Sequence, residues 1–82
     1  MENKINITIR ARSGLLFQGF VDAVSSVNKV GTFDVLPWHT NFVTEIKDAI
    51  IVHLPQGLKT DFPINRGVMK VENNTVEIYV GI

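Results

Sequence analysis

Apolar and polar residues alternate along much of this chain. In residues 4–10 the side chains of Ile5, Ile7 and Ile9 fall on one side, and polar side chains fall on the other. A repeat of two residues is typical of a half-buried β-strand. We therefore predict a first strand over residues 4–10, ended by the Ser13-Gly14 pair.

Shorter segments with similar patterns follow the first one. Residues 15–27 predict two short strands around Gly19. Phe20, Val24 and Val27 of this segment are available for the core. A loop is expected over residues 28–31, because the alternating pattern stops there and resumes at Phe33. The further strands expected before the C-terminal part of the chain cover residues 33–36, 42–46, 48–54 and 58–64.

Three segments carry more specific signals. Residues 48–54 are apolar with a β-branched centre, which is typical of a doubly buried or central strand. Pro63 lacks a backbone donor, so it pushes residues 58–64 toward an edge or an end. The last two segments, GVMKVE and TVEIYV, flank Asn73-Asn74. Asparagine tolerates the positive φ of a primed turn, and a β-hairpin is therefore predicted here.

These segments together predict an all-β fold. A convincing helical stripe is missing from every twelve-residue stretch of the sequence. A series of about eight to ten short strands with Gly or Pro at most junctions is typical of an antiparallel β-sandwich or a small barrel. A chain of 82 residues fits one domain, so residues 1–82 are predicted to form a single β-sandwich domain.

Composition narrows the classes of function. Hydrophobic residues make up 45% of the chain and charged residues 20%, as in folded proteins. Eight basic and eight acidic residues cancel, which argues against binding to nucleic acid or anionic lipid. The chain has no cysteine, which excludes disulfides and thiolate metal sites. We expect no signal peptide and no direct membrane insertion, because the longest apolar run, residues 49–52, is far below about 20 residues.

The two histidines do not indicate a metal site. His39 and His53 are separated along the chain without a third ligand at metal-binding spacing, whereas a zinc or iron site needs three or four converging donors. His53 alternates with Val52 and Leu54, and we expect it on the solvent or rim face of a strand. No metal or cofactor is predicted.

The sequence contains no clear pattern of catalytic residues. His39 has Thr40 and Thr44 nearby as nucleophiles, with Asp34 and Glu45 to orient the ring, but a triad depends on three-dimensional geometry. The pattern of a nucleophile elbow or a Gly-rich phosphate loop is missing from the sequence. The sequence singles out no pair among the candidates for a two-carboxylate mechanism, which are Asp22, Asp34, Asp48 and Asp61. We therefore expect a protein that is not an enzyme.

Trp38, which follows Pro37 in an expected exposed turn, has two readings. It either covers one end of the sandwich or anchors a protein interface, where tryptophan is enriched. A platform for stacking a sugar is a weaker third reading, because a second aromatic residue at a helpful spacing is missing.

Several short motifs follow one another in order along the chain, from about Ile5 to Val80. Their residues are Phe17, Gly19, Val21, Asp22, Val24, Gly31, Phe33, Val35, Leu36, Pro37, His39, Val43, Thr44, Gly67, Val68, Val71, Asn74 and Val76. The order and spacing of these motifs resemble the N-terminal domain of the epsilon subunit of rotary ATP synthases, called delta in mitochondria.

This resemblance implies a ten-stranded antiparallel β-sandwich of two five-stranded sheets. It also implies a non-catalytic subunit of the central stalk, without a cofactor. Such a subunit links the gamma subunit to the membrane c ring and couples ion flow to ATP synthesis or hydrolysis. It would lie peripheral to the membrane, on the cytoplasmic face in a bacterium. The alternative is a stand-alone β-sandwich that recognises a peptide or glycan through Trp38.

Positions carried over from the family predict partner contacts. Ala11, His39 and Thr44 correspond to the gamma-facing side. The loop from Lys29 through Val30 to Thr32 corresponds to the ring-facing side, and Trp38 is expected on a partner surface. The family usually continues into a two-helix domain beyond the position of Ile82, so that domain is not expected from this chain.

Some residues depart from the family pattern. Trp38 replaces the glycine of the family's signature turn, and Asn41 replaces a later proline. The loop that contains Lys29 lacks the family's acidic residue, so a contact with the usual sign of charge is not expected there. Arg66 stands where the first of two glycines would be. These changes indicate either a divergent member with divergent partners or one part of a longer chain.

Overall fold

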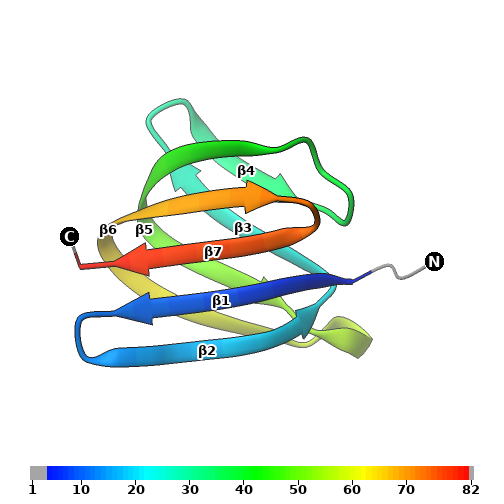
Figure 1. Ribbon diagram of the computed structural model, residues 1–82. Helices are drawn as coiled ribbons and strands as arrows, with labels where there is room; N and C mark the ends of the chain where they lie inside the picture. The colour runs from blue at the N-terminus through cyan, green and yellow to red at the C-terminus, as the bar shows by residue number, and fades with distance from the viewer. Residues whose placement is uncertain (1–3, 82) are drawn as a thin grey trace.

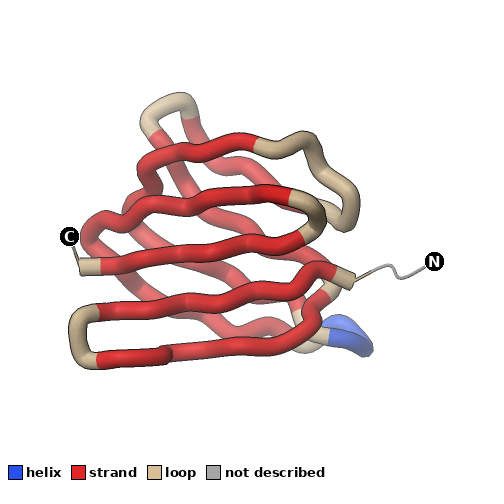
Figure 2. The backbone as a smooth tube through the Cα atoms, in the orientation of Figure 1, coloured by secondary structure: helices blue, strands red, loops and turns tan. Residues whose placement is uncertain are grey.

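The computed structural model describes residues 4–81, and nearly all of them lie in strands or in the turns that join strands (Figures 1 and 2). Pro55–Gly57 forms one short 3-10 turn, η1. Within the described part of the chain, no helix is long and apolar enough to cross a membrane. The strands are β1 (Ile5–Ala11), β2 (Gly14–Val21), β3 (Ala23–Asn28), β4 (Gly31–Val35), β5 (Phe42–His53), β6 (Lys59–Glu72) and β7 (Thr75–Val80).

The seven strands form one hydrogen-bonded sheet in the order β2-β1-β7-β6-β5-β3-β4. The sheet folds over itself, so that β1 and β7 lie in one layer and β3 and β4 in the other (Figure 1). The long strands β5 and β6 pass from one layer into the other (Figure 1). Neighbouring strands are antiparallel except β1 and β7, which run parallel. The all-β prediction is confirmed, but the prediction that every pair is antiparallel is wrong.

The expected ten strands in two five-stranded sheets differ from the seven strands in one sheet that the structure contains. The difference arises because the alternation of apolar and polar residues is interrupted within β5 and within β6 without ending either strand. Lys47 lies opposite Arg66, whereas Asp48 lies opposite Ile64, so Asn65 is the extra residue of a β-bulge. A bulge bends a strand without ending it. Segments predicted as separate strands are therefore continuous in β5 and in β6.

Three specific predictions are confirmed. The second half of β5 lies between β3 and β6, as expected of a central strand. Pro63 lies opposite Ala49 in a part of β6 that precedes the pairing with β7, which begins at Gly67. That part of β6 therefore pairs with β5 on one side and is an edge of the sheet on the other. The β6–β7 turn has φ values of 51° at Asn73 and 63° at Asn74, as a primed hairpin turn requires.

The predictions for residues 15–27 are partly wrong. Gly19 does not interrupt a strand, because β2 continues through it and pairs it with Ile7 of β1. Val21 points into the core, so the alternation of side chains turns Phe20 outward. Phe20 is 66% exposed, and its expected place in the core is therefore wrong. Val24 is buried as expected.

The core fills the space between the two layers. Among residues 4–81 it contains fourteen buried apolar residues, most of them β-branched, which suit a pleated surface. One buried polar residue, Ser26, donates a hydrogen bond of 2.7 Å from its Oγ to the carbonyl of Ala49, so its burial leaves no polar group unsatisfied. The buried apolar residues are Ile5, Ile7, Ile9, Val21, Val24, Val35, Ile46, Ile50, Val52, Met69, Val71, Val76, Ile78 and Val80.

Candidate functional site

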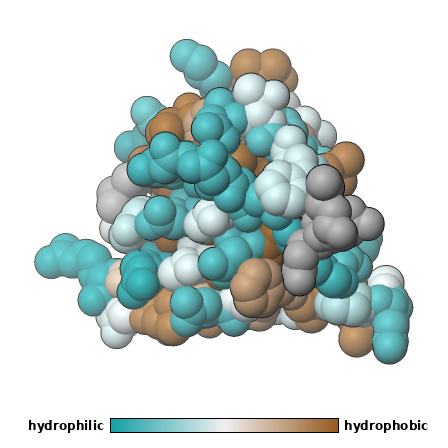
Figure 3. Space-filling model, turned by 45° about the vertical axis from the view of Figure 1, so that its right-hand side comes forward, coloured by the Kyte–Doolittle hydropathy of each residue, from teal (hydrophilic) through white to brown (hydrophobic). Residues whose placement is uncertain are grey.

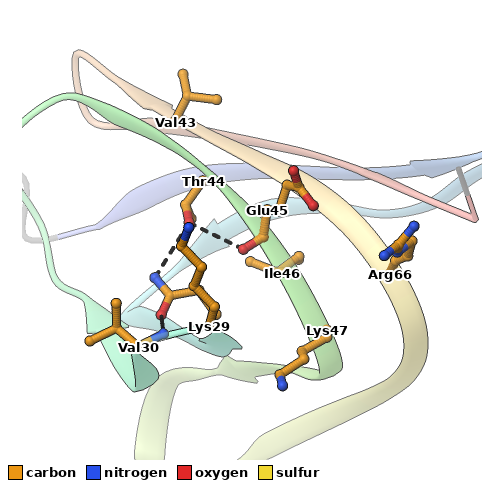
Figure 4. A pocket seen from close by; sticks show the side chains of 9 residues that line it. Lys29, Val30, Val43, Thr44, Glu45, Ile46, Lys47 and Arg66 are labelled. Atoms are coloured by element: carbon orange, nitrogen blue, oxygen red, sulfur yellow. Dashed lines mark hydrogen bonds between the residues drawn. The ribbon is translucent and has the colours of Figure 1, made fainter.

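A groove lies between the β3–β4 turn and the strands β5 and β6 (Figure 4). Its volume is about 570 Å³, and side chains from separate parts of the sequence line it. We call it the turn groove. Its lining residues are Asn28, Lys29, Val30, Val43, Thr44, Glu45, Ile46, Lys47 and Arg66.

Asn28 shapes the turn groove. Its side-chain oxygen accepts hydrogen bonds from the backbone N–H groups of Val30, at 2.9 Å, and Gly31, at 3.3 Å. Such bonds hold a tight turn in place of a backbone ladder. The Nδ2 of Asn28 also donates to Thr44 Oγ1 at 3.3 Å, which ties the turn to β5 (Figure 4). The turn thus holds Val30 outward, where 89% of its surface is exposed.

A second hollow lies beyond the C-terminal end of β6, where the β6–β7 turn meets the turn that carries Trp38. We call it the aromatic hollow. Its volume is about 750 Å³. Phe20 and Trp38, which are 66% and 56% exposed, both line it. The other lining residues are Lys4, Asn6, Asn73, Asn74 and Thr75.

Asn74 joins three segments at the aromatic hollow. Its Oδ1 accepts a hydrogen bond of 2.8 Å from the backbone N–H of Trp38, and its Nδ2 donates one of 2.6 Å to the carbonyl of Lys4. Trp38 is held at φ 66°, a conformation that a bulky residue rarely adopts. Strain of this kind costs on the order of 1–3 kcal/mol and is concentrated at functional positions. The backbone here suits the glycine expected from the family pattern.

Trp38 is 56% exposed, so more than half of its surface is available to a partner. The expected lack of a second aromatic residue is wrong, because β2 brings Phe20 to the same hollow. The sequence could have indicated this only if the outward direction of Phe20 had been recognised. The face brought forward in Figure 3 mixes hydrophobic with hydrophilic residues and has no single large apolar area.

The residues weighed for catalysis do not assemble as a triad. His39 Nδ1 lies 2.8 Å from the carbonyl oxygen of Thr40, and its ring packs against Phe42. Asp34 instead accepts a hydrogen bond of 2.5 Å from Ser25 Oγ.

A different polar chain, which the sequence analysis missed, involves the other histidine. The Oγ of Ser25 lies 2.7 Å from His53 Nε2 and also donates to Asp34. Serine is in the middle of this chain, whereas a catalytic triad places histidine between the other two residues. His53 is a half-buried residue at the end of β5, in agreement with its expected place on the rim. Among residues 4–81 no group of three or more His, Cys, Asp or Glu is placed to hold a metal ion.

The predicted partner-contact residues fall in three places. Lys29, Val30 and Thr44 share the turn groove, although the family pattern assigned Thr44 to a different side from the loop. Trp38 lines the aromatic hollow.

The remaining predicted residues lie beside these sites or apart from them. Thr32 is exposed on β4, just after the turn, and His39 is exposed beside Trp38. Ala11 lies elsewhere, at the β1–β2 turn, where it pairs with Gly14. The sequence analysis missed Lys47 and Phe20 as lining residues, and it noted Arg66 only as a departure from the family.

These features define a small all-β domain whose exposed turns border two surface hollows. The chain matches the family described as "ATP synthase, Delta/Epsilon chain, beta-sandwich domain" over residues 4–81. It therefore belongs to this family, and the predicted resemblance is confirmed.

One curated relative is the ATP synthase epsilon chain of a Nitratiruptor species. It is 35% identical over 71 residues, which are 85% of this chain and 55% of the relative. The chain spans about half the length of the curated relatives it matches.

Two solved structures share the fold. A chain in the mitochondrial ATP synthase of Euglena gracilis has a TM-score of 0.89 at 23% identity, covering 98% of this chain and 52% of that chain. A chain in the central stalk and c-ring structure of Tetrahymena thermophila ATP synthase has a TM-score of 0.78 at 17% identity, covering 99% and 66%. At these identities the likeness supports a common fold.

Proposed function

We propose that this chain acts as a central-stalk subunit of a rotary ATP synthase, linking the gamma subunit to the c ring. The family match over residues 4–81 is the observation that carries the proposal. The Tetrahymena structure, which contains a chain of the same fold, is a central stalk with its c ring, and this supports the assignment. In this role the domain lies peripheral to the membrane, on the cytoplasmic face in a bacterium, and transmits motion without catalysing a reaction.

The fold is physically suited to this role. Close-packed interiors deform little, so a sandwich with a continuous core acts as a stiff block between partners. In the proposal the turn groove, with Lys29 and Val30, faces the ring together with Thr32, which lies beside the groove on β4. His39 and Ala11 face the gamma subunit. Thr44 lies in the turn groove in this structure, on the same surface as Lys29 and Val30.

Isolation of the complex tests the proposed function. The chain, tagged and expressed in its native cells, is expected to co-purify with the gamma subunit, the c ring and the catalytic subunits. A retained complex of this composition at moderate salt supports the proposal. Recovery of the folded chain without any ATP synthase subunit would contradict it.

A second candidate function is binding of a peptide or glycan at the aromatic hollow, and one observation favours it. Phe20 and Trp38 are brought to one hollow from separate strands and turns, beside the amide side chains of Asn6 and Asn73. Exposed aromatic rings beside hydrogen-bonding groups suit both an extended peptide and the apolar face of a sugar.

Substitution of Trp38 separates the two candidates. Glycine adopts the positive φ of this position without strain, and Trp38→Gly also removes the indole. The free energy of unfolding is therefore expected to rise by about 0.5–1 kcal/mol or to stay unchanged. Thermal unfolding measures this effect. If the aromatic hollow is the functional site, binding to a peptide or glycan array is lost in Trp38→Gly and kept in a Tyr79→Ala control, which removes an exposed aromatic elsewhere. If the variant still assembles into ATP synthase and the wild-type chain binds nothing on the array, the second candidate is wrong.

A further inference from the structure

The turn groove concentrates positive charge. The whole chain has eight basic and eight acidic residues, and its formal charge is zero. The groove is lined by three cations, Lys29, Lys47 and Arg66, and by one carboxylate, Glu45. The two ion pairs among residues 4–81 lie elsewhere on the surface. The groove therefore presents an excess of cations that neighbouring side chains do not neutralise.

Two of these cations lie opposite each other. Lys47 on β5 and Arg66 on β6 are register partners in the antiparallel pair, and both are exposed. Like charges in directly opposite positions of a sheet destabilise it. The buried neighbour Ile46 fixes the alternation of β5, so Lys47 stays on the outer face. Carboxylates supplied from outside the chain would convert this repulsion into attraction.

The groove also exposes apolar surface. Val30 on the β3–β4 turn and Val43 on β5, which are 89% and 65% exposed, both line it, and the side chain of Val43 points away from the turn (Figure 4). The hydrogen bond between Asn28 and Thr44 ties the turn to β5. Valine side chains add nothing to the binding of a small inorganic anion, but they favour a segment that has apolar side chains beside its acidic ones.

We propose that the turn groove binds a segment of a partner protein in which acidic residues alternate with small apolar residues. Charge complementarity with Lys29, Lys47 and Arg66 would orient the segment, and Val30 and Val43 would pack against its apolar side chains. The proposal rests on the proposed function, because the partner is sought among the subunits of the ATP synthase. It reverses the sign of charge expected from the family pattern for this loop.

Site-specific cross-linking identifies the segment. The chain has no cysteine, so Val30→Cys gives one position for a benzophenone label. Within the purified ATP synthase, the label is expected to link to a segment with net negative charge. The same label at Lys59, outside the groove, is expected to miss that segment. Linkage to a basic or uncharged segment overturns this proposal while the proposed function stands. Failure of the labelled and unlabelled chains to join the complex overturns both.

Charge reversal tests the electrostatic part of the proposal. The double variant Lys29→Glu, Arg66→Glu is expected to raise the Kd for the stalk complex about tenfold at low salt, because two attractive contacts with the acidic segment become repulsive. The matched control, Arg12→Glu with Lys59→Glu, makes the same change in charge outside the groove and should change the Kd less than about twofold. High salt should remove the difference. An equal loss in both double variants contradicts the proposal.

A second variant covers the case in which the double variant does not fold. Glu45→Gln removes the only carboxylate of the groove lining and leaves the cations in place. It is expected to lower the Kd about twofold at low salt, because a repulsive contact with the acidic segment is lost. An unchanged or higher Kd in folded Glu45→Gln overturns the proposal.

Discussion

Ile7→Ala is expected to lower the free energy of unfolding by about 2–5 kcal/mol, which is much of the stability of a domain of this size. Ile7 lies at the centre of β1, between β2 and β7, and none of its surface is exposed. Truncation removes apolar contacts and leaves a cavity that hydrogen-bonded strands on both sides cannot close by moving together. Urea unfolding followed by circular dichroism measures the change.

The adjacent residue provides the control for this prediction. Thr8 lies on the same strand with its side chain on the opposite, half-exposed face. Thr8→Ala is expected to change the free energy of unfolding by about 1 kcal/mol or less, because it creates no cavity and only lowers β-propensity. If the two substitutions had equal effects, the assignment of the inner and outer faces of β1 would be wrong.

Much of the fold could be predicted from local patterns. Ile5, Ile7 and Ile9 revealed the inner face of β1, and Asn73-Asn74 revealed a hairpin, because strand alternation and turn chemistry are local properties. The number of strands could not be predicted in the same way. A bulge at Asn65 and a chain turn both interrupt an alternating pattern, and only the register of β5 against β6 distinguishes them.

The candidate sites were less predictable, because they depend on contacts between distant segments. Trp38 could be singled out from the sequence, but the hollow that it lines together with Phe20 depends on the register of β2 against β1 and on the position of the β6–β7 turn. The basic turn groove likewise requires Lys47 and Arg66 to lie opposite each other. An even balance of charge along the sequence concealed this local concentration.

Gly67→Ala is expected to lower the free energy of unfolding by about 1–3 kcal/mol, although it adds only one methyl group. Gly67 is buried in β6 opposite Val80 of β7. A Cβ atom placed here would lie 2.6 Å from the carbonyl oxygen of Tyr79 and 3.3 Å from a methyl group of Val80. The first contact is with backbone, which cannot rotate away, so β6 and β7 must separate at this point.

The same substitution links stability to the turn groove. Arg66 precedes Gly67, and a displaced β6 would move Arg66 away from Lys47. Gly67→Ala should therefore weaken the stalk complex even at temperatures where the variant is fully folded. Gly19→Ala is the matched control, because the nearest atom to its added Cβ would be 4.0 Å away, an ordinary contact. Thermal unfolding and Kd measurements on both variants test this link. A stable Gly67→Ala protein with unchanged Kd would mean that the close approach of β6 to β7 does not set the position of Arg66.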